Sequence, residues 1–278
     1  MVGMWLYNIC IALYAALVRL VAPFNEKARL WCSGRKGMIE RLRGAIGEDD
    51  RVVWIHVSSL GDFEQGRPLV DYVHSHYPDY KVLLTFYSPA GYEVRKNYPN
   101  ADYVSYIPVD TRRRVRRFLD VVKPEIAIFV KYEFWLNMLC ELRRRNIRTY
   151  IASAIFRRNS IFFHPFGGLW RKALGAFDTL FVQDENSKHL LAEIGYENVV
   201  VAGDTRFDRV ITIADEAERV DVVEQFKGAK RLFVAGSTWG PDEEILLPLI
   251  DENPDIEFEV APHEMDESRI ERILREVK

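Results

Sequence analysis

The chain has 278 residues, 48% of them hydrophobic and 28% charged, so it can bury a substantial core in one large or two ordinary domains. Its 38 basic and 41 acidic residues give a formal charge of -3, which argues against a general nucleic-acid binder. Three widely spaced cysteines, Cys10, Cys32 and Cys140, indicate neither a disulfide framework nor a zinc site. We expect a globular protein of a reducing compartment, with neither a metal site nor nucleic acid as a partner.

The N-terminal segment, residues 1–22, is apolar and carries no charged side chain before Arg19. A spanning helix needs about 20 apolar residues, so this run is marginal. It favours a membrane anchor in contact with membrane lipids, either a short transmembrane helix or an interfacial helix, over a buried N-terminal helix. Basic residues follow directly and predict that the body lies in the cytoplasm: Lys27, Arg29, Arg35, Lys36, Arg41 and Arg43.

Apolar, β-rich runs then alternate with segments of helical periodicity. After a basic helix at 26–44, strands are expected at 52–57, 81–85, 103–108, 125–130, 148–153, 179–182 and 199–202. Helices are expected at 66–76, 90–97, 111–122, 134–145, 165–175 and 186–194. Such alternation is typical of an α/β fold with a mostly parallel, Rossmann-like sheet and helices on both faces.

A second unit is expected after the charged helical stretch 207–228. It contains a strand at 231–235, the turn Gly236-Ser237-Thr238, a helix at 242–250, a strand at 257–261 and a helix at 266–277. Two βα repeats are too few for a sheet of ordinary size. We therefore expect one complete domain at 23–215 and the incomplete start of another at 216–278.

The first candidate site residue is Asp62, which follows the strand at 52–57 through the small residues Ser58, Ser59 and Gly61. Open α/β sheets build ligand sites at this edge, beside helix N-termini that can receive an anion. The alternative is structural, with Asp62 capping the helix and Glu64 favouring its first turn.

The second candidate is Glu133, which follows the strand at 125–130. If this strand and the strand at 52–57 are parallel neighbours, Glu133 and Asp62 share one crevice, an arrangement suited to acid–base chemistry. Glu133 as a first-turn acid of the next helix is an equal alternative.

Three further strand ends carry candidate binding residues. Arg206 suits a carboxylate or phosphate, although it could instead be a surface residue paired with Asp204 or Asp208. Ser237 and Thr238 offer hydroxyl and N–H groups to an anion, and Pro262 and His263 end the last predicted strand. Most arginines at helix ends are expected to be solvated, and Arg67, Arg157 and Arg158 are the better phosphate candidates. An aromatic segment is either an apolar surface or core: Phe162, Phe163, Phe166 and Trp170.

Four ordered elements carry a resemblance that runs from about Asn25 to the C-terminus: S-L-G-D at 59–62, E-F-W at 133–135, G-D-T-R-F-D at 203–208 and A-P-H at 261–263. They resemble the bacterial transferases of 3-deoxy-D-manno-octulosonic acid (Kdo). This resemblance implies a GT-B-like architecture of two Rossmann-like domains. The family's general base, usually Glu, falls on Asp62, which is one methylene shorter, and Glu64 is a possible substitute.

The resemblance also implies roles for the other candidates. In the family, the Glu at position 133 helps stabilise the transition state, and a Lys at the position of Arg206 assists it. The donor segment that contacts the cytidine nucleotide falls on Pro262 and His263. The implied activity is inverting transfer of Kdo from CMP-Kdo to the lipid A precursor, without a cofactor, at the cytoplasmic face of the bacterial inner membrane. The later segments that complete nucleotide binding are absent before Lys278, so this truncated chain is expected to bind CMP-Kdo poorly, and whether it is active stays open.

Two other functions compete with this interpretation. One is a non-catalytic, membrane-bound module that binds anionic glycolipid. The other is a nucleotide-binding oxidoreductase, which is weakened because no G-x-G-x-x-G follows any predicted strand.

Overall fold

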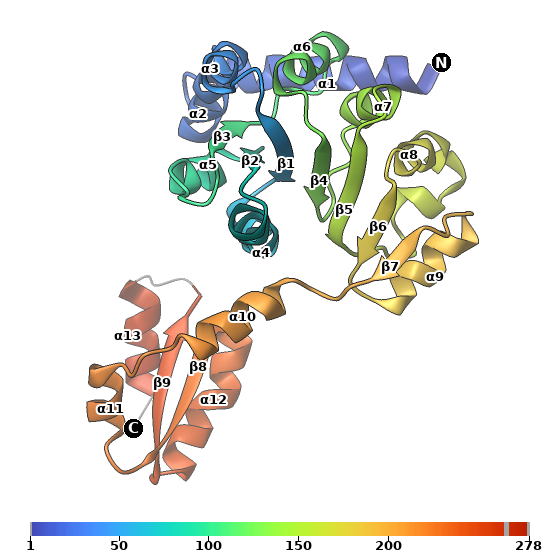
Figure 1. The fold of residues 1–278 in the computed structure, drawn as a ribbon. Coiled ribbons are helices and arrows are strands. Elements are labelled where there is room, and N and C mark those ends of the chain that lie inside the picture. The colour runs from blue at the N-terminus through green and yellow to red at the C-terminus, as the bar shows by residue number, and fades with distance from the viewer. Residues whose placement is uncertain (1, 264–266, 277–278) are drawn as a thin grey trace. The chain divides into compact units, whose positions relative to one another are not determined.

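The computed structural model describes residues 2–263 and 267–276. The chain forms two compact units, Met1–Ala214 and Asp215–Lys278 (Figure 1). Each unit is an α/β structure in its own right.

The first unit contains a seven-stranded parallel sheet with the order β3-β2-β1-β4-β5-β6-β7. The expected Rossmann-like sheet is therefore confirmed, and β1 and β4 are the parallel neighbours that the prediction about Glu133 required. The strands are β1 (Arg51–Val57), β2 (Tyr80–Phe86), β3 (Tyr103–Tyr106), β4 (Ile126–Val130), β5 (Arg148–Ala154), β6 (Thr179–Val182) and β7 (Val199–Val201).

Helices pack on both faces of this sheet (Figure 1). Helix α4 covers one face at β1, β2 and β4, whereas α3, α6 and α7 pack into the cluster on the other face. The helices of this unit are α1 (Val2–Val21), α2 (Glu26–Arg35), α3 (Met38–Ala45), α4 (Leu60–His76), α5 (Pro89–Arg95), α6 (Arg112–Val122), α7 (Leu136–Arg144), α8 (Gly168–Leu174), α9 (Glu185–Glu193) and α10 (Arg206–Asp215), with 3-10 turns at Ile161–Phe163 and Pro165–Gly167.

The close approach of α4 to the sheet depends on Gly66. A Cβ atom at this position would lie 2.8 Å from Val57 Cγ1 and 3.3 Å from Val130 Cγ2. The glycine therefore lets the helix backbone sit directly over the ends of β1 and β4. This contact fixes the first turns of α4, including Asp62, beside the carboxyl ends of both strands.

Helix α1 lies along the first unit with one face packed and the other exposed. Tyr7 Oη donates a 2.6 Å hydrogen bond to Asp110 Oδ2, and Asn137 Nδ2 donates a 2.8 Å bond to Asn8 Oδ1. Ala15 is buried, so the contact extends along the helix. By length and composition Gly3–Val21 could cross a membrane, yet only 6% of its apolar window is buried, so α1 is not a buried core helix. Its outward face exposes Trp5, Leu6, Leu13, Tyr14, Leu17, Leu20 and Val21.

The second unit contains two parallel strands, β8 (Arg231–Thr238) and β9 (Ile256–Pro262). Its helices are α11 (Asp221–Lys227), α12 (Gly240–Glu252) and α13 (Glu267–Glu276). This agrees with the two βα repeats expected for residues 216–278.

Several predicted boundaries were wrong for local reasons. Helix α4 begins at Leu60 rather than at residue 66, because Ser59 caps it. The expected helix at 26–44 is two helices, separated at Gly37, whose φ is +68°. The expected turn Gly236-Ser237-Thr238 belongs to β8, and α12 begins after Trp239.

Candidate active site

The sheet reverses its winding direction between β1 and β4. Strands β2 and β3 lie on one side of β1, and β5, β6 and β7 follow β4 on the other. In open α/β sheets the crevice at such a switch point, beyond the carboxyl ends of the strands, is the usual ligand site. Asp62 follows β1 and Glu133 follows β4, so both candidate carboxylates lie at the carboxyl ends of the two strands that meet at the switch point.

Glu133 is held by two donors, the buried His56 and the half-buried Trp135. Its residue is 8% exposed, and its Oε2 lies 3.0 Å from His56 Nε2 and 2.6 Å from Trp135 Nε1. No described residue donates a hydrogen bond to Oε1. This oxygen is not among the described buried atoms that lack a partner. Helix α7 begins only at Leu136, so the alternative of Glu133 as a first-turn acid is wrong. One oxygen is thus anchored and the other is left for a ligand.

The direction of the hydrogen bonds around His56 follows from its neighbours. The Trp54 indole can only donate, and its Nε1 lies 2.8 Å from Thr85 Oγ1. The Thr85 hydroxyl can then donate to His56 Nδ1 across 2.9 Å, so that Nε2–H donates to Glu133. We assign this tautomer because it gives every donor in the chain an acceptor.

Asp62 completes a capping box at the N-terminus of α4. Its Oδ2 accepts from Ser59 N at 3.1 Å and from Ser59 Oγ at 2.7 Å, while Lys131 Nζ lies 3.1 Å from Oδ1. Asp62 therefore does take part in capping α4, as the structural alternative expected. Lys131, which directly follows β4, adds a positive charge beside it. Lys131 has a φ of +65°, a conformation that non-glycine residues rarely adopt and that concentrates at functional sites.

Arg206 is joined to α4 through Asp204. Asp204 Oδ2 accepts from Arg206 Nε at 2.9 Å and from Nη2 at 2.6 Å, and Gln65 Nε2 donates to its Oδ1 at 2.8 Å. Thr205 Oγ1 also donates to the backbone oxygen of Gln65 at 2.7 Å. The loop after β7 is thereby tied to the helix that carries Asp62. The Arg206 side chain is still 59% exposed, so the pairing with Asp204 leaves part of it open to a ligand.

The charge of Arg206 acts on Asp204. Partial burial alone would raise the pKa of Asp204, but hydrogen bonds from Arg206 and Gln65 lower it to about 2. Asp204 is therefore an ionised anchor for Arg206 at neutral pH.

In the second unit, the nucleotide candidates lie at one edge of the small sheet. Thr238 pairs with Pro262, and the backbone N–H of His263 donates to Thr238 O at 3.0 Å. The His263 ring stacks on Trp239 with centroids 4.6 Å apart. Thr238 is buried and its hydroxyl donates to Glu243, whereas Ser237 and His263 are exposed. The two predicted segments are thus adjacent, but the Thr238 hydroxyl is already engaged.

Other candidates from the sequence have structural partners. Glu64 pairs with Arg95 at 3.0 Å, away from the Asp62 contacts, and Arg158 pairs with Glu193. Arg67 lies within α4 rather than on a loop, and its Nε donates to Tyr98 Oη at 3.1 Å. Of the aromatic segment, Phe162 is core and Phe166 is 91% exposed. Arg67 and Arg158 are therefore poorer phosphate ligands than the sequence suggested.

Sequence reasoning missed His56, Gln65 and Lys131. His56 lies inside an apolar strand, where a fully buried polar side chain is itself a signal. Gln65 and Lys131 flank the named motifs, but only the fold shows that they reach Asp204 and Asp62.

Residues 33–209 match the family model described as 3-Deoxy-D-manno-octulosonic-acid transferase (kdotransferase). The chain belongs to this family. The match covers β1 to β7 and includes all three residues of the candidate active site, Asp62, Glu133 and Arg206.

Curated relatives agree with this membership. The chain is 27% identical over 203 residues to the 3-deoxy-D-manno-octulosonic acid transferase of Haemophilus influenzae, covering 70% of this chain and 47% of the relative. It is 25% identical over 213 residues to the enzyme of that name from Rickettsia bellii, covering 75% of this chain and 51% of the relative. The chain thus spans about half the length of these relatives.

Solved structures share the fold. A UDP-N-acetylglucosamine 2-epimerase superimposes with a TM-score of 0.62 at 14% identity, over 83% of this chain and 66% of the other. The UDP-GlcNAc 2-epimerase of Neisseria meningitidis gives 0.60 at 15% identity, over 82% and 69%. The Kdo transferase family member therefore has the expected GT-B-like, Rossmann-like α/β fold.

Proposed function

We propose that this chain carries the acceptor half of an inverting glycosyltransferase that moves Kdo from CMP-Kdo to the lipid A precursor in lipopolysaccharide synthesis. Family membership supports Kdo transfer. The observation that carries the proposal is the position of Asp62 and Glu133, which follow neighbouring strands at the switch point of the sheet.

In this proposal Asp62 is the general base. Its carboxylate accepts the proton of the acceptor hydroxyl as that oxygen attacks the anomeric carbon of Kdo. The bond from that carbon to the CMP phosphate breaks in the same displacement, so the configuration inverts. Lys131, 3.1 Å from Asp62 Oδ1, supplies a positive charge beside the base.

Glu133 and Arg206 have electrostatic roles in the transition state. The anchored carboxylate of Glu133 faces the positive charge that develops at the sugar carbon, and the exposed guanidinium of Arg206 receives the phosphate of the leaving CMP. In the second unit we assign donor contacts to Ser237, Thr238, Pro262 and His263. Of these, Ser237 and His263 present exposed side chains.

The exposed face of α1 supports an interfacial membrane anchor rather than a transmembrane one. Tyr7 and Asn8 bond to Asp110 and Asn137 of the body, contacts that a helix directed across a bilayer could not keep. Leu13 and Leu17, on the outward face, are each 59% exposed and can enter the acyl boundary while the helix lies flat. We propose that this face binds membrane lipids at the cytoplasmic side of the inner membrane.

The test is incubation of the protein with CMP-Kdo and tetraacyl lipid A precursor, followed by mass spectrometry of the lipid. Asp62→Asn and Glu133→Gln should each reduce transfer by about 100-fold or more. Glu64→Gln is the matched control, because Glu64 lies on the same helix but pairs with Arg95. Equal activity in all three variants would remove Asp62 and Glu133 from the mechanism.

A non-catalytic glycolipid-binding module is the second candidate. It is favoured by the contacts of Asp62, since Ser59 and Lys131 already occupy both carboxylate oxygens. Binding of the lipid A precursor without any transfer from CMP-Kdo would support this function.

A further inference from the structure

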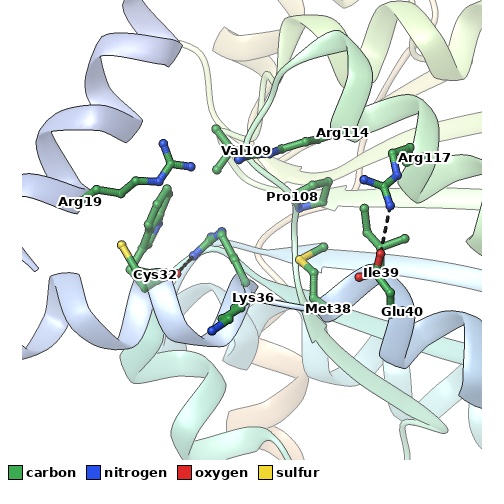
Figure 2. Close-up of a pocket in the computed structure, with 13 residues that line it drawn as sticks. Arg19, Cys32, Lys36, Met38, Ile39, Glu40, Pro108, Val109, Arg114 and Arg117 are labelled. Carbon is green, nitrogen blue, oxygen red and sulfur yellow. Dashed lines mark hydrogen bonds and ion pairs between the residues drawn. The ribbon is translucent and has the colours of Figure 1, made fainter.

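A cavity of about 390 Å³ lies where α1, α2, α3 and α6 meet. Figure 2 shows side chains from these helices around it, and the loop after β3 supplies Pro108 and Val109. Five basic side chains and one carboxylate line this cavity, which we call the basic pocket: Arg19, Arg35, Lys36, Arg114, Arg117 and Glu40. The carboxylate is already paired, since Arg117 Nη2 lies 3.0 Å from Glu40 Oε1.

Two guanidinium groups face each other across the basic pocket. Arg19 of α1 and Arg114 of α6 reach toward one another in Figure 2. Burial lowers the pKa of Arg114, and the positive charge of Arg19 lowers it further. Among the described residues, none forms an ion pair with either side chain. An anion between them would replace this repulsion by two attractive contacts.

Arg35 adds a third unneutralised charge in the wall. Its guanidinium donates to the backbone oxygens of Ile107 at 3.0 Å and Tyr87 at 2.9 Å, and lies 4.2 Å from the ring centroid of Trp31. Burial lowers the pKa of Arg35 to about 10. Within the part of the chain that the structure describes, no carboxylate pairs with it. Because carbonyl oxygens and rings carry no full negative charge, the pocket keeps a strong positive potential.

We propose that the basic pocket binds a phosphate group, and that its source is the headgroup of an anionic membrane phospholipid. Arg19 and Arg114 are its main ligands, and the exposed Lys36 is a further one. A guanidinium pair matches the geometry of phosphate oxygens, and 390 Å³ is ample for a headgroup.

The position of Arg19 indicates the lipid source. It lies in the last turn of α1, close along the helix to the exposed apolar residues Leu13, Leu17 and Leu20. This step rests on the proposed function, because it assumes that α1 lies in the membrane interface. With α1 at the acyl boundary, Arg19 is at the depth of the lipid phosphates.

The pocket wall is also continuous with the candidate active site. Arg35 bonds to Tyr87 O, the Tyr87 ring stacks on Trp135 with centroids 5.0 Å apart, and Trp135 Nε1 donates to Glu133. A lipid bound in the pocket would therefore hold the carboxyl ends of the strands close to the membrane surface.

The experiment is cosedimentation with vesicles of phosphatidylcholine alone or with 30% phosphatidylglycerol. Wild-type protein should prefer the anionic vesicles, and Arg114→Gln and Arg19→Gln should each weaken that binding by roughly tenfold, beyond the loss of about fivefold expected for one diffuse surface charge. Arg113→Gln is the matched control, because Arg113 is the exposed neighbour on α6 that does not line the pocket. Thermal melting of each variant checks that it is folded.

Three results would overturn the proposal. Equal losses of binding to anionic vesicles in Arg113→Gln and Arg114→Gln would mean that only diffuse electrostatic attraction to the membrane is at work. Equal binding of wild-type protein to both vesicles would exclude an anionic headgroup. The third result combines two observations: inorganic phosphate binds in ³¹P NMR and this binding is lost in Arg114→Gln, but the protein shows no preference for anionic vesicles. This result would assign the pocket to free phosphate. Transfer of Kdo to detergent-dispersed acceptor is measured separately, so a failed pocket proposal leaves the proposed function intact, and the reverse also holds.

Discussion

His56 Nε2 lies 3.0 Å from Glu133 Oε2, and both residues are buried, with His56 completely inaccessible to solvent. The histidine comes from the penultimate position of β1 and the glutamate from the loop after β4. The contact thus crosses the switch point and locks the carboxylate between two strands. We regard His56 as a positioning residue, because it acts through Glu133.

His56→Ala should reduce kcat for Kdo transfer by roughly 10- to 100-fold with little change in KM, because Glu133 loses a donor that orients it. His56→Gln keeps an N–H donor and should restore part of the rate. His74→Ala, at an exposed position of α4, is the control and should match wild type. If His56→Ala raised KM alone, or all three variants had equal rates, the positioning role would be wrong.

The fold was predictable because apolar, β-branched strands such as Val52–Val57 stand out between helices of clear periodicity. The site was only partly predictable. Asp62 and Glu133 each follow a strand, which sequence shows, but their placement at the ends of neighbouring strands depends on β4 pairing with β1, a relation between residues far apart in the chain. His56 stands out as a polar residue in an apolar strand, but its partner Glu133 is 77 residues away in the chain, so the contact is visible only in the fold.

Lys131 and Asp62 should behave as one functional unit. Lys131→Met and Asp62→Asn should each lower kcat/KM strongly, and the double variant should be little worse than either, because both remove the same contact. Kinetics on the four-member cycle measure this coupling. The same cycle on Lys96 and Glu93, an exposed pair at 2.7 Å, should be additive. Additive effects at Lys131 and Asp62 would contradict the proposed coupling.

Asp204 should contribute to acid stability. Its folded-state pKa of about 2 lies below the ordinary carboxyl value. Its contribution to the free energy of unfolding is therefore fully present above about pH 4 and is lost as the pH falls toward 2. The expected size is about 1–2 kcal/mol, because Arg206 is largely exposed. In urea unfolding from pH 2 to 6, the free energy of unfolding should fall less toward acid pH for Asp204→Asn than for wild type. Asp208→Asn, at an exposed neighbour, should keep the wild-type slope.

The anchoring of α1 can be tested at Tyr7. Asp110 is a buried carboxylate that accepts from Tyr7 Oη and from the backbone N–H groups of Asn137 and Met138, each 2.9 Å away at the start of α7. Burial raises the pKa of Asp110, against the effect of these hydrogen bonds.

Tyr7→Phe removes one of these donors while keeping the ring. It should lower the free energy of unfolding at neutral pH by about 1–3 kcal/mol, because a buried charge loses a partner. The loss should shrink in acid, where protonated Asp110 needs fewer donors. Urea unfolding measures both effects, and Tyr72→Phe, at a 53% exposed position on α4, is the control. An unchanged unfolding midpoint for Tyr7→Phe would show that α1 detaches in solution without cost, and the interfacial orientation proposed for it would lose its structural basis.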